Sequence, residues 1–115
     1  MSGWAAVCAL DDLVPDRGAA ALVTTPDGPR QVAIFRLSDG ALHAVGHRDP
    51  FTGANVIARG LVGTRGEVPT VASPLHKQVF DLRTGAALDY PDVSLDGWEV
   101  RVVEGSVHVR PREGP

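Results

Sequence analysis

Short runs of alternating apolar and polar residues, separated by turn residues, cover much of this chain. Residues 98–103 alternate apolar and mostly charged side chains, and residues 106–110 alternate valines with polar side chains. A period of two directs one side of a strand to the interior and the other to water. Glu104-Gly105, between the two runs, is a turn signal. These residues predict a β-hairpin.

Other strands are expected between turn signals of the same kind, such as Ser38-Asp39-Gly40 and Arg83-Thr84-Gly85. Residues 31–37 are apolar on both faces except for Gln31 and Arg36, so this strand is expected to be central in its sheet. Helix signals are weak, and residues 11–15 could form one capped turn at most. The pattern predicts an all-β, antiparallel fold with strands at 4–8, 19–24, 31–37, 41–45, 78–82, 98–103 and 106–110.

The connection over residues 46–69 breaks this rhythm. It is rich in glycine and has few alternating apolar residues. A connection this long in a small β domain is usually functional or mobile. Its apolar residues suggest that it folds back on itself; they are Phe51, Val56, Ile57, Leu61 and Val62.

Length and charge narrow the picture. The 115 residues fit one domain, with 4–110 ordered and 111–115 expected to be a flexible tail. The net charge of −3 does not indicate the basic surface that would bind nucleic acid or an anionic membrane. No apolar stretch is long enough to span a membrane, and the first residues do not form a signal peptide. We therefore expect a cytoplasmic protein with no nucleic-acid or membrane partner.

Residues 73–85 carry the most distinctive motif, which is Ser-Pro-Leu-His-Lys-Gln-Val-Phe-Asp-Leu-Arg-Thr-Gly. It resembles the second cluster-binding loop of Rieske proteins, close to Cys-Pro-x-His-x-x-x-Phe-Asp-x-x-Thr-Gly, except that Ser73 replaces the cysteine. Residues 44–55 resemble the first loop, where Rieske proteins carry Cys-x-His. The four ligand positions of a Rieske centre then fall on His47, Asp49, Ser73 and His76.

The cysteine count decides against the cluster itself. A Rieske [2Fe–2S] centre needs two cysteines and two histidines, but Cys8 is the only cysteine, and we expect it to be a core residue of the first strand. Of the four ligand positions, only His76 keeps the expected residue type. We therefore predict a chain without a metal or cofactor.

The two motifs together are similar to one branch of the Rieske superfamily, the small subunits of cytoplasmic NAD(P)H-dependent nitrite reductases, over about residues 4–110. The resemblance implies a Rieske-like antiparallel β sandwich or barrel with a small two-loop subdomain. It also implies a large-subunit partner that carries sirohaem, an iron–sulfur cluster and FAD and reduces nitrite to ammonia with NAD(P)H, as in nitrate assimilation. The small subunit is then a subunit of an oxidoreductase with no catalytic site of its own.

If this architecture holds, several loop residues gather at one end of the molecule and are candidates for the partner interface. The alternative for each is a solvated loop face without a partner. The candidate set is His47, Arg48, Asp49, Phe51, Arg59, His76 and Lys77.

Two other functions stay open at this point. The first is a Rieske-type electron-transfer protein, which the single cysteine argues against. The second is a small metal-dependent enzyme that uses His47, Asp49 and His76, because two imidazoles and a carboxylate suit zinc or non-haem iron. Against the metal, these residues could tie two loops together by hydrogen bonds. Ser73 is more simply a loop cap, its hydroxyl accepting a backbone N–H, than a nucleophile.

Overall fold

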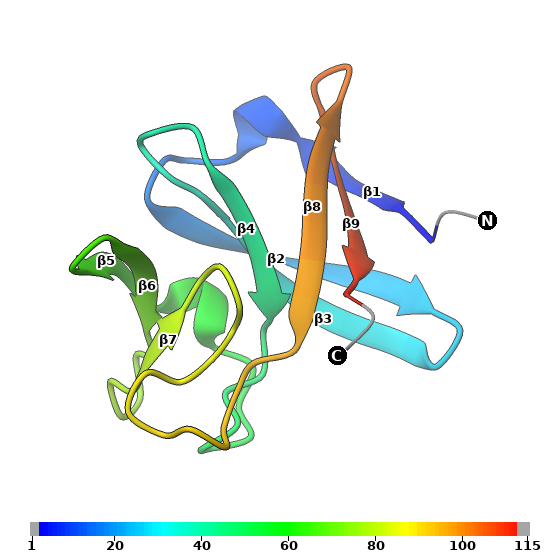
Figure 1. The fold of residues 1–115 in the computed structure, drawn as a ribbon. Coiled ribbons are helices and arrows are strands. Elements are labelled where there is room, and N and C mark those ends of the chain that lie inside the picture. The colour runs from blue at the N-terminus through cyan, green and yellow to red at the C-terminus, as the bar shows by residue number, and fades with distance from the viewer. Residues whose placement is uncertain (1–2, 113–115) are drawn as a thin grey trace.

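The computed structural model describes residues 3–112, which form an all-β fold of two antiparallel sheets, as predicted (Figure 1). No helix in this part of the chain is long and apolar enough to cross a membrane. The elements are β1 (Ala5–Ala9), η1 (Leu10–Asp12), β2 (Arg17–Thr25), β3 (Gly28–Arg36), β4 (Leu42–Gly46), η2 (Ile57–Arg59), β5 (Leu61–Arg65), β6 (Val68–Ala72), β7 (Val79–Asp81), β8 (Gly97–Val103) and β9 (Ser106–Pro111), where η1 and η2 are single 3-10 turns.

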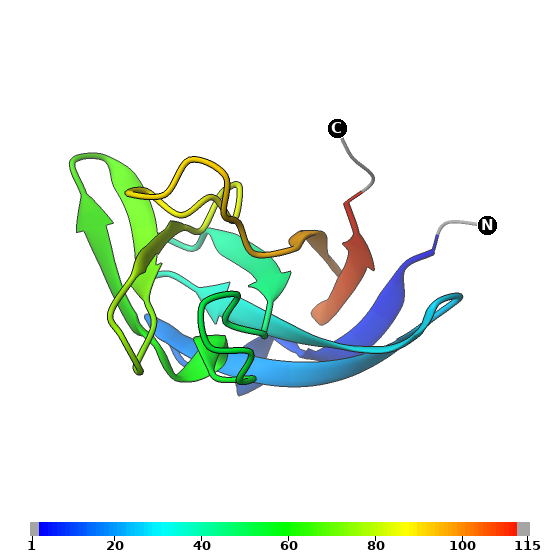
Figure 2. The same cartoon turned by 90° about the horizontal axis from the view of Figure 1, so that it is seen from below.

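The larger sheet has the strand order β1-β9-β8-β4-β3-β2. It curls strongly, so that its two edge strands, β1 and β2, come into contact and the sheet approaches a closed barrel. Figure 2 shows this curvature along β2 and β3, which form a long hairpin that extends beyond β4. The predicted hairpin at the end of the chain is β8–β9.

β3 is central because it supplies side chains to two separate cores. Val32 and Ile34 belong to the core inside the larger sheet, which also contains Trp98. Ala33 and Phe35 belong to a second core, between the larger sheet and the smaller one. Successive side chains of a strand point to opposite faces, so a strand that is apolar on both faces can serve both cores.

The smaller sheet, with order β5-β6-β7, contains a hairpin that the sequence analysis did not predict. β5 and β6 lie within or next to the connection over 46–69, which was expected only to fold back. Gly66, with φ of 63°, lies in the turn between them. β5 lacks the alternation of apolar and polar residues that predicts a strand, because nearly all of its side chains are exposed.

The ordered chain also continues further than expected. Pro111, predicted to begin a flexible tail, pairs with Trp98 at the end of β9. The N–H of Arg112 donates to the carbonyl of Gly97 at 3.0 Å. The rest of the predicted tail, 113–115, lies outside the described residues. Pairing with β8 explains why the strand extends through Pro111.

Candidate functional site

Two loops carry the degenerate ligand positions, and both lie at the end of the molecule away from the β8–β9 turn (Figure 1). The first loop, residues 47–56, connects β4 to η2. The second loop, residues 73–78, connects β6 to β7. A third connection, residues 82–96, joins β7 to β8 at the same end. We call this end the tip.

The second loop is a tight turn closed by its own backbone. The N–H of Ser73 donates to the carbonyl of Gln78 at 2.9 Å, and the N–H of Lys77 donates to the carbonyl of Ser73 at 3.0 Å. Lys77 has a φ of 61°, in the left-handed region. Closing the turn this way leaves residues 74–77 exposed at the tip.

A buried hydrogen bond joins the two loops. The hydroxyl of Ser73 donates to Oδ2 of Asp49 at 2.5 Å, and both side chains are at most 1% exposed. Oδ1 of Asp49 accepts the N–H of Phe51 at 2.8 Å. The Ser73 hydroxyl also accepts the N–H of Leu75 at 3.4 Å, the predicted capping contact. The interpretation that loop residues tie the two loops together is therefore confirmed for Asp49, whose partner in the second loop is Ser73.

His47 is buried and connects the first loop to η2. Its Nδ1 accepts the N–H of Ala58 at 3.1 Å, and its carbonyl accepts the N–H groups of Val56 and Ile57. Burial, assisted by the charge of Arg59, holds the pKa of His47 below its ordinary value of 6.5. A neutral ring that accepts at Nδ1 carries its proton on Nε2. His47 therefore acts as a structural acceptor.

The residues at the ligand positions do not fit a [2Fe–2S] centre. The side chains of Asp49 and Ser73 form a hydrogen bond with each other, and neither residue can supply the thiolate that the cluster needs. Cys8 lies in β1, a strand of the larger sheet outside both loops. The donor chemistry therefore removes the support for a Rieske-type electron carrier.

The proposed set of three metal ligands is not assembled either. Within residues 3–112, no three His, Cys, Asp or Glu side chains lie close enough to hold a metal ion. His47 and Asp49 are buried in separate hydrogen bonds, whereas His76 is exposed on the second loop. The alternative of a metal-dependent enzyme that uses His47, Asp49 and His76 therefore loses its site, because hydrogen bonds within the fold engage His47 and Asp49 separately.

The second half of the long motif builds the scaffold beneath the loops. Phe80 and Leu82 are fully buried. Burial by itself would raise the pKa of Asp81, but hydrogen bonds from the side chain and backbone of Arg83, with its charge, outweigh this and hold the pKa below 3.8. Gly85 has a φ of 86°, and a Cβ there would lie 2.6 Å from the carbonyl oxygen of Leu95. This part of the motif therefore needs its residue types to fold.

The structure divides the candidate interface residues into two groups. Arg48, Arg59, His76 and Lys77 are exposed, and Phe51 is half-buried. His47 and Asp49 were expected at an exposed tip, but they are 6% and 0% exposed because their polar atoms bond inside the loops. They position the surface and do not form it.

Two apolar residues outside the predicted interface set are also exposed at the tip. Leu75 is 49% exposed on the second loop, and Tyr90 is 46% exposed on the third connection. The ring of Tyr90 meets that of Phe51 edge-on, with centroids 4.8 Å apart, and Phe51 also contacts Phe80. Leu75 lies inside the motif, and its position between Pro74 and His76 at a loop apex was the available signal.

Comparisons with known proteins agree with this architecture. A family model described as the Rieske-like [2Fe-2S] domain matches residues 3–110. The nitrite reductase (NADH) small subunit of Escherichia coli K12 is 38% identical over 111 residues, which are 96% of this chain and 99% of the relative. The nitrite reductase NAD(P)H large subunit of Klebsiella oxytoca is 39% identical over 106 residues, which are 92% of this chain but 11% of that protein.

A solved structure gives the same result for the fold. The Mycobacterium tuberculosis protein, provisionally named an NADH-dependent nitrite reductase small subunit, superimposes with a TM-score of 0.86 at 48% identity, covering 97% of this chain and 96% of that one. Sequence and fold agree over nearly the whole length of both proteins. The chain therefore belongs to the Rieske-like domain family and, within it, to the nitrite reductase small subunits.

Proposed function

We propose that this chain is a non-catalytic subunit that binds the large subunit of an NAD(P)H-dependent nitrite reductase in the cytoplasm. The observation that carries the proposal is the Klebsiella oxytoca large subunit, in which 11% of the chain aligns with 92% of this one. Because that large subunit contains a segment similar to this chain, we expect a large subunit and a small subunit to associate when they are separate chains.

In this proposal, the redox groups belong to the partner. Sirohaem, an iron–sulfur cluster, FAD and the NAD(P)H site would lie in the large subunit, which would reduce nitrite to ammonia. The contribution of this chain is a folded surface, since its loops are held by hydrogen bonds at the positions where Rieske proteins hold iron.

The tip is the surface that best fits this role. Its loops carry the exposed cations Arg48 and Lys77 and the apolar side chain of Leu75, which is 49% exposed; Arg59, also exposed, lies in η2. Arginine and tyrosine are enriched at interface hot spots, and the tip carries Arg48 and the 46% exposed Tyr90. The buried Asp49–Ser73 hydrogen bond fixes the two loops relative to each other, so little ordering is needed on binding.

Charge reversal at the tip tests the proposal. Arg48→Glu with Lys77→Glu should weaken binding to the large subunit, measured by co-elution and by biolayer interferometry. Both side chains are exposed, so circular dichroism and the melting temperature should stay close to those of the unchanged protein.

The matched control is Arg17→Glu with Arg101→Glu, which changes the net charge equally on exposed positions of β2 and β8. It should bind normally. Normal binding by the folded tip variant, or weaker binding by the control than by the tip variant, would place the interface elsewhere, and no complex with the unchanged chain would refute the proposed function.

A further inference from the structure

A polar cleft of about 600 Å³ opens beside the first loop. Its walls are residues 29–31 at the start of β3, residues 46–48, 50 and 55 around the first loop, and residues 94–96 of the third connection. The long β2–β3 hairpin forms one side, because it extends beyond the end of β4 (Figure 2). None of the hydrogen bonds that tie the two loops uses this space.

His47 is one of the residues that line this cleft, and its ring carries one donor. Its Nδ1 is occupied by the N–H of Ala58, so the proton of the neutral ring is on Nε2. Nε2 has no hydrogen-bond partner among residues 3–112, so its N–H remains available to donate to a ligand. The bond to Ala58 fixes the ring and therefore the direction of this N–H.

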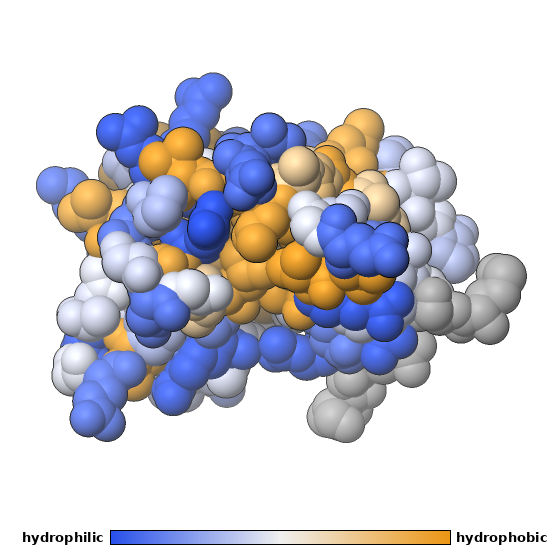
Figure 3. All heavy atoms as spheres, turned by 90° about the horizontal axis from the view of Figure 1, so that it is seen from above, coloured by the Kyte–Doolittle hydropathy of each residue, from blue (hydrophilic) through white to orange (hydrophobic). Residues whose placement is uncertain are grey.

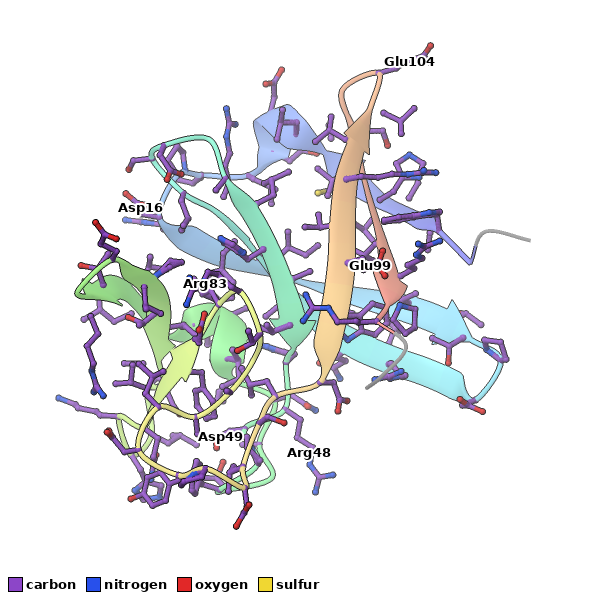
Figure 4. The ribbon with its side chains drawn as sticks, viewed as in Figure 1. Asp16, Arg48, Asp49, Arg83, Glu99 and Glu104 are labelled. Carbon is purple, nitrogen blue, oxygen red and sulfur yellow. The ribbon has the colours of Figure 1, made fainter. Side chains whose placement is uncertain are left out.

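The charges around the cleft favour an anion. Arg48 is exposed and makes no ion pair within the described chain, and its side chain projects away from the ribbon (Figure 4). Arg30 pairs with Asp96 at 2.9 Å and lies over the ring of Trp98 at 4.9 Å, so it is held in place. Arg48, Arg30 and Asp96 together carry a net charge of +1, although the net charge of the whole protein is −3.

We infer that this cleft binds a carboxylate of the partner protein, carried by an Asp or Glu side chain of the large subunit. A carboxylate has two acceptor oxygens, which match the fork of an arginine and leave an acceptor for the Nε2–H of His47. The cleft is far larger than a single carboxylate needs, so it has room for the segment that carries one. This inference rests on the proposed function for the identity of the partner.

A zero-length cross-link tests the inference directly. Lys77 is the only lysine of the chain. The variant Arg48→Lys with Lys77→Arg therefore moves the one lysine amine to the cleft and keeps the net charge. Treating its complex with the large subunit with a carbodiimide should give a heterodimer whose link, located by mass spectrometry, joins residue 48 to an Asp or Glu of the large subunit.

The matched control is Arg17→Lys with Lys77→Arg. Arg17 is also exposed. In the β2–β3 register it lies opposite Arg36, at the far end of β3, about 17 Å along the strand from Gln31 of the cleft. This variant carries the same Lys77→Arg change as the test variant and should give no heterodimer through residue 17.

The outcomes separate the two proposals. A complex that forms without a link at residue 48, or with a link only to the chain's own Asp96, overturns the cleft assignment and leaves the proposed function standing. Failure of the unchanged chain to form any complex overturns the proposed function, and the partner carboxylate with it.

Discussion

Asp49 is fully buried, and both of its carboxylate oxygens accept hydrogen bonds: Oδ2 from the Ser73 hydroxyl and Oδ1 from the N–H of Phe51. In the Rieske pattern these two positions would hold a histidine and a cysteine bound to iron. Here the pair joins the same two loops without a metal. A buried charge is tolerated only when it is well paired, so each donor matters to stability.

Removing the hydroxyl should therefore be costly. Ser73→Ala leaves Oδ2 of Asp49 without its donor, and we expect a loss of about 1–3 kcal/mol in the free energy of unfolding, measured by urea denaturation. Ser94→Ala, at an exposed serine of the third connection, is the control and should change little. If the two variants unfold at the same urea concentration, the Asp49–Ser73 bond does not hold the loops.

His47 should make stability depend on pH. Burial and the charge of Arg59 lower its pKa in the folded state, so the unfolded chain binds the proton more tightly. The stability gained from the neutral ring is then complete above pH 6.5 and decreases as the pH falls below that value. Protonation would also put a donor at Nδ1, facing the N–H of Ala58.

The substitution His47→Asn tests this, because its amide oxygen can still accept the N–H of Ala58 but does not titrate. Urea denaturation at pH 7.5 and at successively lower pH should show a weaker acid loss than in the unchanged protein. Part of the loss should remain, because burial also lowers the pKa of His43. His76→Asn, at an exposed ring, is the control and should retain the full dependence; a full dependence in His47→Asn would contradict the assignment.

At the scale of elements, the sequence predicts strands well where alternation or two-sided burial marks them. β3 follows from its apolar run, and β8–β9 follows from alternation around Glu104-Gly105. β5 could not be found in this way, because it is exposed at nearly every position and gains its regularity from pairing with β6. Pairing between strands is a tertiary property, which a local pattern does not contain.

The close contact between β2 and η2 gives a prediction at this scale. A Cβ at Gly18 in β2 would lie 2.3 Å from the carbonyl oxygen of Ala58, the residue whose N–H binds His47. Gly18→Ala should displace η2 and cost about 1–3 kcal/mol, as overpacking does. Heteronuclear NMR should show shifts at Ala58 and His47.

Gly63→Ala is the matched control on β5. A Cβ there meets only the Thr70 hydroxyl at 3.7 Å, an ordinary contact, and its backbone does not require glycine. This variant should unfold as the unchanged protein does. Equal stability of the two alanine variants would mean that η2 moves away without cost.

For the molecule as a whole, the sequence predicts which residues form the candidate site better than it predicts their exposure. The motifs identify both loops, and the single cysteine is enough to exclude the cluster. The burial of His47 and Asp49 depends on bonds to Ala58 and Ser73, which are 11 and 24 residues away. Such contacts are set by the assembled fold, so composition and spacing do not reveal them.

The two ends of the molecule present different surfaces to a partner. Seen from the end of the β8–β9 turn, apolar side chains gather in the middle of the face within a hydrophilic surround (Figure 3). Glu104 marks this end, whereas Arg48 marks the opposite end (Figure 4). Val102 and Val103, next to Glu104, are each 40% exposed. This second surface is the alternative to the tip as the binding site for the large subunit.

Fluorescent labels at the two ends distinguish these surfaces. Lys77→Cys places a thiol at the tip and Glu104→Cys places one at the far end, both on exposed turn residues with positive φ. Cys8 should react slowly, because burial, assisted by Asp12, raises its pKa and lowers its thiolate fraction. Adding the large subunit should shift and polarise the emission of the label at residue 77 much more than that at residue 104. The reverse order would move the interface to the β8–β9 end, because a dye covered by the partner loses contact with water whichever surface is used.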